Sequence, residues 1–188
     1  MAHARFDPTH SVRFDLGRGQ LKVDGRENRL LVPSDALLGL WAEASDEAKK
    51  NFGQRLGTEI GRRAAGRLGS VEAASIPAMV EHLGGDIALC GLGSLSVERW
   101  GKALVLRVDG SPLGAEGDAL LAAVLEGALH RAMGRDVAAV RLDRDDQRVR
   151  FLVVSPGAAS RVRGWLAEGK PWGQVLTTLD GAGAPGAE

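Results

Sequence analysis

The chain has 188 residues, and its 24 basic and 24 acidic side chains give a formal net charge of zero. Proteins that bind nucleic acid usually carry a basic excess, so this class is disfavoured. The single cysteine excludes an internal disulfide framework and favours a reducing compartment. No apolar run approaches the roughly 18 residues of a membrane span, and the polar start does not resemble a signal peptide, so we expect a cytoplasmic protein.

One folded domain is expected between two tails. Residues 1–10 are polar and show no apolar period, which is typical of a flexible arm. Residues 180–188 are small and polar and are expected to be disordered. Nothing between these tails resembles a linker, so residues 11–179 are predicted to form a single domain with its own core.

The domain begins with short extended segments. Apolar and polar residues alternate over residues 12–16, a glycine-containing turn follows, and the alternation returns over residues 21–23, which predicts a peripheral hairpin. Residues 30–32 form another short apolar run that we expect to be extended. Ser34 then begins a short helix as its N-cap, and Ser45 begins a long helix that runs to about Leu68.

The long helix carries a strip of small residues beside its apolar stripe. The strip repeats every four residues and ends in alanine: Gly53, Gly57, Gly61 and Ala64. An interior glycine costs a helix roughly 1 kcal/mol relative to alanine, so three glycines need an offsetting gain. We interpret the strip as a surface against which another backbone packs closely, with the lining of a cavity as the alternative.

The stretch from Leu95 to Val154 predicts a β-β-α-β-β core. A helix before it is expected to stop at Gly84 and Gly85, and a short helix over residues 158–167 follows it. The alternating runs and the amphipathic helix of the core lie at residues 95–97, 104–108, 118–133, 138–142 and 149–153.

No motif in the chain points to a reaction. Cys90 follows an apolar run and is interpreted as a packing residue, with a nucleophile paired to His82 as the alternative. The cysteine and histidines lack metal-ligand spacing, so neither a metal nor a cofactor is expected. The acidic residues at 143–146 are interpreted as a solvated hairpin tip rather than a cation site. The arginines at 62–67 are interpreted as a solvated helix end rather than an anion site.

The order of these elements resembles a known family. Between Arg29 and Val154 the chain resembles the 4-vinyl-reductase-type hydrocarbon-binding domain, whose fold is shared by the Bet-type subunits of the TRAPP vesicle-tethering complex. The resemblance is carried by NRLLVPSDALLGLW, FGQRLGTEIGRRAAG, WGKALVLRVDGSPLG, GDALLAAVLEGALHRAMGRDVAAVRL and VRFLVV. It implies an α/β (α+β) fold in which an antiparallel sheet of about four strands packs against helices. It also implies a tendency to dimerise and an apolar pocket of the kind that bacterial sensors use for small molecules.

The chain departs from the family in two respects. Many of its bacterial members carry cysteines around the last hairpin that resemble a zinc site, whereas RLDRDDQRVRFLVV contains none. The related haem-binding nitric-oxide sensors use a tyrosine-containing motif, and this chain has no tyrosine. Neither zinc nor haem is therefore carried over.

The residues and the resemblance together leave two functions open. The first is a non-enzymatic, dimeric scaffold module that acts through protein partners, in which the strip of Gly53, Gly57, Gly61 and Ala64 meets its own copy across a two-fold axis. The second is a sensor or carrier that holds a small apolar ligand between the sheet and the long helix. The side chains expected to line that ligand pocket are Phe52, Leu56, Ile60, Trp100, Leu106 and Val124.

Overall fold

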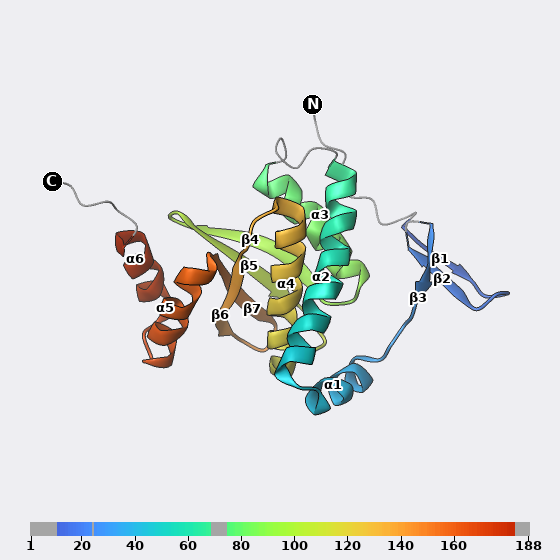
Figure 1. Cartoon of the computed structure of the whole chain (residues 1–188), viewed down its shortest axis with the longest axis horizontal. Helices are drawn as coiled ribbons and strands as arrows, with labels where there is room; N and C mark the ends of the chain where they lie inside the picture. The colour runs from blue at the N-terminus through green and yellow to red at the C-terminus, as the bar shows by residue number, and fades with distance from the viewer. Residues whose placement is uncertain (1–10, 24, 69–74, 183–188) are drawn as a thin grey trace.

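The computed structural model describes residues 11–23, 25–68 and 75–182 and shows a mixed α/β fold (Figure 1). A four-stranded antiparallel sheet forms its centre, in the order β4-β5-β7-β6. Its strands lie at the predicted alternating runs, and the sheet is of the kind that the family resemblance implies. Its strands are β4 (Ser94–Trp100), β5 (Ala103–Asp109), β6 (Ala138–Arg144) and β7 (Arg148–Val154).

The register gives the sheet two distinct faces, because neighbouring residues of a strand point to opposite sides. Leu106 pairs with Val97 on one side and Phe151 on the other, and these three belong to the inner face. Val105 pairs with Leu152 on the outer face. Each face is covered by its own set of helices, so the sheet separates two apolar clusters.

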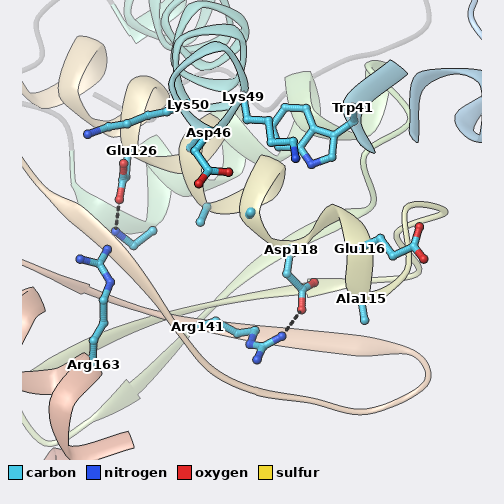
Figure 2. A pocket seen from close by; sticks show the side chains of 14 residues that line it. Trp41, Asp46, Lys49, Lys50, Ala115, Glu116, Asp118, Glu126, Arg141 and Arg163 are labelled. Carbon is cyan, nitrogen blue, oxygen red and sulfur yellow. Dashed lines mark hydrogen bonds and ion pairs between the residues drawn. The ribbon is translucent and has the colours of Figure 1, made fainter. Parts of the chain in front are cut away.

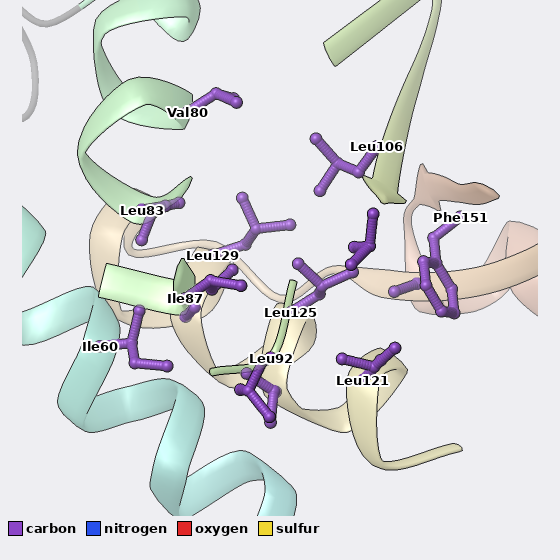
Figure 3. Packing of buried hydrophobic residues seen from close by; sticks show 14 of the residues in the cluster. Ile60, Val80, Leu83, Ile87, Leu92, Leu106, Leu121, Leu125, Leu129 and Phe151 are labelled. Carbon is purple, nitrogen blue, oxygen red and sulfur yellow. The ribbon is translucent and has the colours of Figure 1, made fainter. Parts of the chain in front are cut away.

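Three helices cover the inner face: α2 (Asp46–Leu68), α3 (Ile76–Leu89) and α4 (Asp118–Met133). Leu121, Leu125 and Leu129 recur along α4 at helical spacing, and they are fully buried in the inner cluster with Phe151 of β7 (Figure 3). The predicted helix over residues 118–133 is therefore confirmed, and Gly134 ends it in the left-handed conformation (φ 65°) that favours glycine.

Two helices cover part of the outer face: α5 (Pro156–Ala167) and α6 (Trp172–Ala182). Val162 and Val175 are completely buried against this face of the sheet. The domain was expected to end at residue 179 with a disordered tail after it, but α6 continues to Ala182. The rest of the predicted tail lies outside the described residues, as does the predicted arm over residues 1–10.

The prediction for α3 was wrong at its end. Gly84 and Gly85 lie inside the helix, which continues to Leu89 before Gly91 turns the chain at a φ of 70°. A Cβ on Gly84 would lie 3.2 Å from the carbonyl oxygen of Leu95 in β4. Gly84 therefore permits α3 to approach the edge strand β4 closely, rather than stopping the helix.

The N-terminal segment forms a small sheet at one side of α2 (Figure 1). Its three antiparallel strands are β1 (Val12–Asp15), β2 (Gln20–Val23) and β3 (Arg26–Arg29). The predicted hairpin is thus present with a third strand, whereas residues 30–33 form no strand and lead into α1 (Ser34–Glu43). An ion pair of 2.9 Å between Arg29 and Glu59 joins this small sheet to α2.

Candidate functional site

The glycine strip of α2 packs against α4 of the same chain. A Cβ on Gly57 would lie 2.8 Å from the backbone nitrogen of Ala128, and one on Gly53 would meet the Ala123 methyl group. Gly127 of α4 in turn lies against the backbone of Gln54. Close backbone approach is therefore the right interpretation of the strip. The expected dimer interface through Gly53, Gly57, Gly61 and Ala64 is wrong, because all four residues are already buried where α2 packs inside the monomer.

The six side chains expected around an apolar ligand do not gather around one hollow. Ile60, Leu106 and Val124 are fully buried in the close-packed inner cluster, and Leu56 packs at its edge. The other two are exposed, Phe52 beside Trp41 on α1 and Trp100 beside Trp172 of α6. Trp100 was placed wrongly, because it pairs with Ala103 on the outer face of the sheet, opposite Leu106.

A different hollow lies where the first turns of α2 and α4 meet the edge strand β6. We call it the alanine pocket, and its volume is about 550 Å³ (Figure 2). Its floor is built mainly by small side chains of α4 and β6, with the buried Trp41 of α1 at one end. The apolar part of its lining is Trp41, Ala115, Ala119, Ala122, Ala123 and Ala139. Larger side chains at the five alanine positions would fill the space, so the hollow exists because these residues are alanine.

Two carboxylates at the pocket already have partners. Asp118, in the first turn of α4, is buried and accepts hydrogen bonds from Arg144 at 2.6 and 2.8 Å and from Arg141 at 3.1 Å. Glu126 accepts a hydrogen bond of 3.1 Å from the backbone N–H of Ala139, on the outer edge of β6, the last strand of its sheet. These contacts hold the pocket wall in place and leave the two carboxylates little remaining capacity to accept hydrogen bonds from a ligand.

Other charged groups at the pocket remain available. The side chains of Lys49, Lys50 and Arg163 form no hydrogen bond or ion pair with any described residue. In Figure 2, Arg163 of α5 points toward the end where Lys50 and Glu126 lie, and Lys49 lies beside Trp41. Asp46 and Glu116 also line the pocket, so its rim has mixed charge. The pocket therefore offers an apolar floor and a rim whose cations can bind polar or anionic atoms of a ligand.

The arginines of α2 do not form a solvated helix end. Arg63 is buried, and its Nε lies 3.1 Å from Oδ1 of Asp86 in α3, which also pairs with Arg67. Arg63 also donates a hydrogen bond of 3.7 Å to the Cys90 sulfur. Cys90 is exposed as a residue rather than packed in the core, and partial desolvation of its thiol raises the pKa, with Arg63 opposing that shift. A raised pKa disfavours the thiolate that a nucleophile needs.

The described parts of the chain hold neither a metal cluster nor a membrane span. Across residues 11–23, 25–68 and 75–182, no three histidine, cysteine, aspartate or glutamate side chains lie close enough together to hold a metal ion. No helix within these ranges is both long and apolar enough to cross a lipid bilayer.

Comparison with known proteins identifies the fold. No family model matches the sequence, and no curated protein matches it either. Among solved structures, the chain is similar to the phenol-responsive sensory domain of the transcription activator PoxR, determined with phenol. The match has a TM-score of 0.58 at 15% sequence identity and covers 79% of this chain and 90% of that one. At this identity the likeness shows that the two chains share a fold.

Proposed function

We propose that this protein is a small-molecule-binding domain of the sensor or carrier type, and that the alanine pocket is its binding site. The observation that carries the proposal is the shared fold with a sensory domain that responds to phenol, a small and largely apolar molecule. This neighbour supports the ligand-binding hypothesis better than the scaffold hypothesis, and it is a sensory domain rather than an enzyme. The sequence resembles the hydrocarbon-binding family, and we include membership of that family in the proposal.

The chemistry of the pocket defines the kind of ligand. A volume of about 550 Å³ is within the roughly 300–1,000 Å³ range of small-molecule sites. The alanine methyl groups and the Trp41 ring would contact a flat apolar body. Lys49, Lys50 and Arg163 would bind its oxygen atoms, so the expected ligand is a small aromatic or aliphatic compound with one hydroxyl or carboxylate group.

The pocket is also lined by helices whose packing a bound ligand would change in a sensor. Its lining spans α1, α2, α4, β6 and α5, and Arg163 belongs to the helix pair that covers the outer face. A ligand held between α4 and Arg163 would favour the arrangement in which α5 stays against the sheet. The proposed output is therefore a change in the packing of α5 and α6.

The proposal is tested first by asking whether the protein carries or accepts such a ligand. Native mass spectrometry of the purified protein is expected to show an added small mass, or to show binding when phenol and simple aromatic acids are supplied. Thermal denaturation with the same compounds is expected to give a higher midpoint, because a ligand that binds only the folded state stabilises it. No added mass and no shift with any member of the panel would contradict the proposal.

A further inference from the structure

The charged groups of the alanine pocket differ between its two ends. Four cationic and four acidic side chains line the hollow, so its charges balance overall. In Figure 2, Arg163 and Lys50 lie at one end of the pocket, and Glu116 lies at the other. Because an α-helix rises about 1.5 Å per residue, Asp118 and Glu126 lie about 12 Å apart along α4. The arrangement of the charges, rather than their sum, therefore decides what the pocket binds.

The edge of β6 adds a backbone hydrogen-bond donor to the pocket. Ala139 of this last strand donates its N–H to Glu126 of α4 rather than to β7. In an antiparallel pair, residues that exchange both backbone hydrogen bonds with the opposite residue alternate with residues that exchange none. Arg141 lies two residues further in the same register, opposite Phe151, so its N–H also points away from β7. Among the described residues this N–H has no partner, and Arg141 lines the pocket.

The groups available to a ligand near this end donate hydrogen bonds and accept none. They are the guanidinium of Arg163, the ammonium of Lys50 and the N–H of Arg141, which lies about 7 Å along the strand from that of Ala139. A phenol hydroxyl carries a proton that needs an acceptor, whereas a carboxylate only accepts. Hydrogen bonds to an ionised acceptor are also roughly twice as strong as those between neutral groups. This end of the pocket therefore suits a carboxylate better than a hydroxyl.

We infer that the alanine pocket selects a small aromatic carboxylate, with the carboxylate between Arg163 and the N–H of Arg141 and the ring over the alanine floor. This inference rests on the proposed function and narrows it, because a hydroxyl compound becomes the weaker ligand. A phosphate monoester fits less well than a carboxylate, since it carries up to about two negative charges and Glu126 lies at the same end.

Three compounds separate charge from shape in the test. Benzoate carries the carboxylate, benzamide has nearly the same shape without the charge, and phenol carries the hydroxyl. Isothermal titration calorimetry of wild type at pH 7 is expected to show benzoate binding about tenfold more tightly than benzamide or phenol, because hydrogen bonds to a charged group are the stronger ones.

Two variants of α5 test the part played by Arg163. Arg163→Gln is expected to weaken benzoate binding about tenfold and to bring the affinities for benzoate and benzamide close together. Arg161→Gln is the matched control, because Arg161 is exposed on the same helix and does not line the pocket. Both arginines are exposed, so circular dichroism of the two variants should match wild type. General damage to the pocket would weaken both compounds alike and would leave their ratio unchanged.

The backbone donor is observed directly by NMR of ¹⁵N-labelled protein. The amide proton of Arg141 is expected to move to lower field as benzoate is added, and to move less with benzamide. The amide of Val140 is the internal control, because this residue pairs with Leu152 and its N–H faces into the sheet. Movement of the Val140 amide with a stationary Arg141 amide would contradict the proposed position of the carboxylate.

The calorimetry distinguishes failure of this inference from failure of the proposed function. Benzamide or phenol binding as tightly as benzoate would overturn the inference and leave the proposed function intact. An Arg163→Gln variant that keeps the full preference for benzoate would do the same. Failure of all three compounds to bind wild type would overturn both.

Discussion

The α-carbon of Gly57 in α2 lies directly against the carbonyl oxygen of Val124 in α4, and a Cβ at position 57 would overlap that oxygen. The two helices can approach this closely only because the side chain is missing. Gly57→Ala is therefore expected to destabilise the fold by about 3 kcal/mol, the size of a severe overpacking effect. Chemical denaturation followed by circular dichroism measures the change.

Gly66 provides the matched control on the same helix. A Cβ at this position would meet no atom within 4 Å, and the residue is exposed. Gly66→Ala should therefore leave the free energy of unfolding unchanged or raise it by up to about 1 kcal/mol, because alanine has the higher helix propensity. Equal effects of the two substitutions would show that α2 and α4 do not pack through the glycine strip.

Substitution of Asp118 tests how much the ion pair in the wall of the alanine pocket contributes to stability. Its side chain is 6% exposed and bound by Arg144, whose own side chain is 15% exposed. Asp118→Asn would leave the partly buried guanidinium of Arg144 without its counter-charge, and the expected loss of stability is about 3 kcal/mol. Glu168→Gln removes an exposed ion pair with Lys170 and should change stability by less than about 1 kcal/mol. A mild effect of Asp118→Asn would indicate that the pair is solvated.

Glu59 gives the fold a pH dependence. Its hydrogen bond from Arg62, supported by Arg29 and opposed by partial burial, lowers the pKa of this carboxyl to about 2. A pKa that is depressed in the folded state contributes stability above the unfolded value of about 4.5, and that stability is lost as the pH falls toward 2. After allowance for solvent screening, the contribution is on the order of 1 kcal/mol.

The corresponding experiment compares wild type with Glu59→Gln across pH. Wild type is expected to be the more stable protein at pH 7, and the difference should shrink between about pH 5 and pH 2. Urea denaturation at several pH values measures it. A difference that stays constant over this range would mean that the Glu59 carboxyl has an ordinary pKa.

A substitution that fills the alanine pocket should weaken ligand binding without changing the fold. Ala119 lines the pocket and is exposed, so Ala119→Trp is expected to occupy the space without disturbing the core. The substitution should weaken the binding of phenol or an aromatic acid at least tenfold, a loss of about 1.4 kcal/mol of binding free energy. Ala167→Trp, at the exposed end of α5, is the control and should bind as wild type does. Isothermal titration calorimetry distinguishes the two outcomes.

The central sheet and α4 could be predicted because their signals are local. Alternation over residues 104–108 and 149–153 places Leu106 and Phe151 on one face, and the structure pairs these two residues directly. The position of Gly134 after an amphipathic run likewise predicts the end of α4. Such signals depend on residues that are close in sequence.

The site could not be predicted in the same way, because it depends on distant elements. The four-residue spacing of glycines shows that something packs closely on α2, but not whether α4 or a second copy does so. Trp100 looks apolar in the sequence, yet its place in the β4 register puts it on the outer face. Alanines at positions 119 and 122 are ordinary helix formers, and only the approach of α1, α5 and β6 makes them a pocket floor.

The central claim is that a small apolar ligand binds at the alanine pocket, and alanine-methyl NMR tests it most directly, because the floor of the pocket consists of alanines. Protein labelled with ¹³C at the alanine methyl groups would be titrated with phenol. We predict that the resonances of Ala119, Ala122 and Ala139 shift and saturate together, while the buried Ala132 and Ala159, which do not line the pocket, stay unchanged. Saturable shifts confined to Ala132 or Ala159, or no shifts at all, would contradict ligand binding at this pocket.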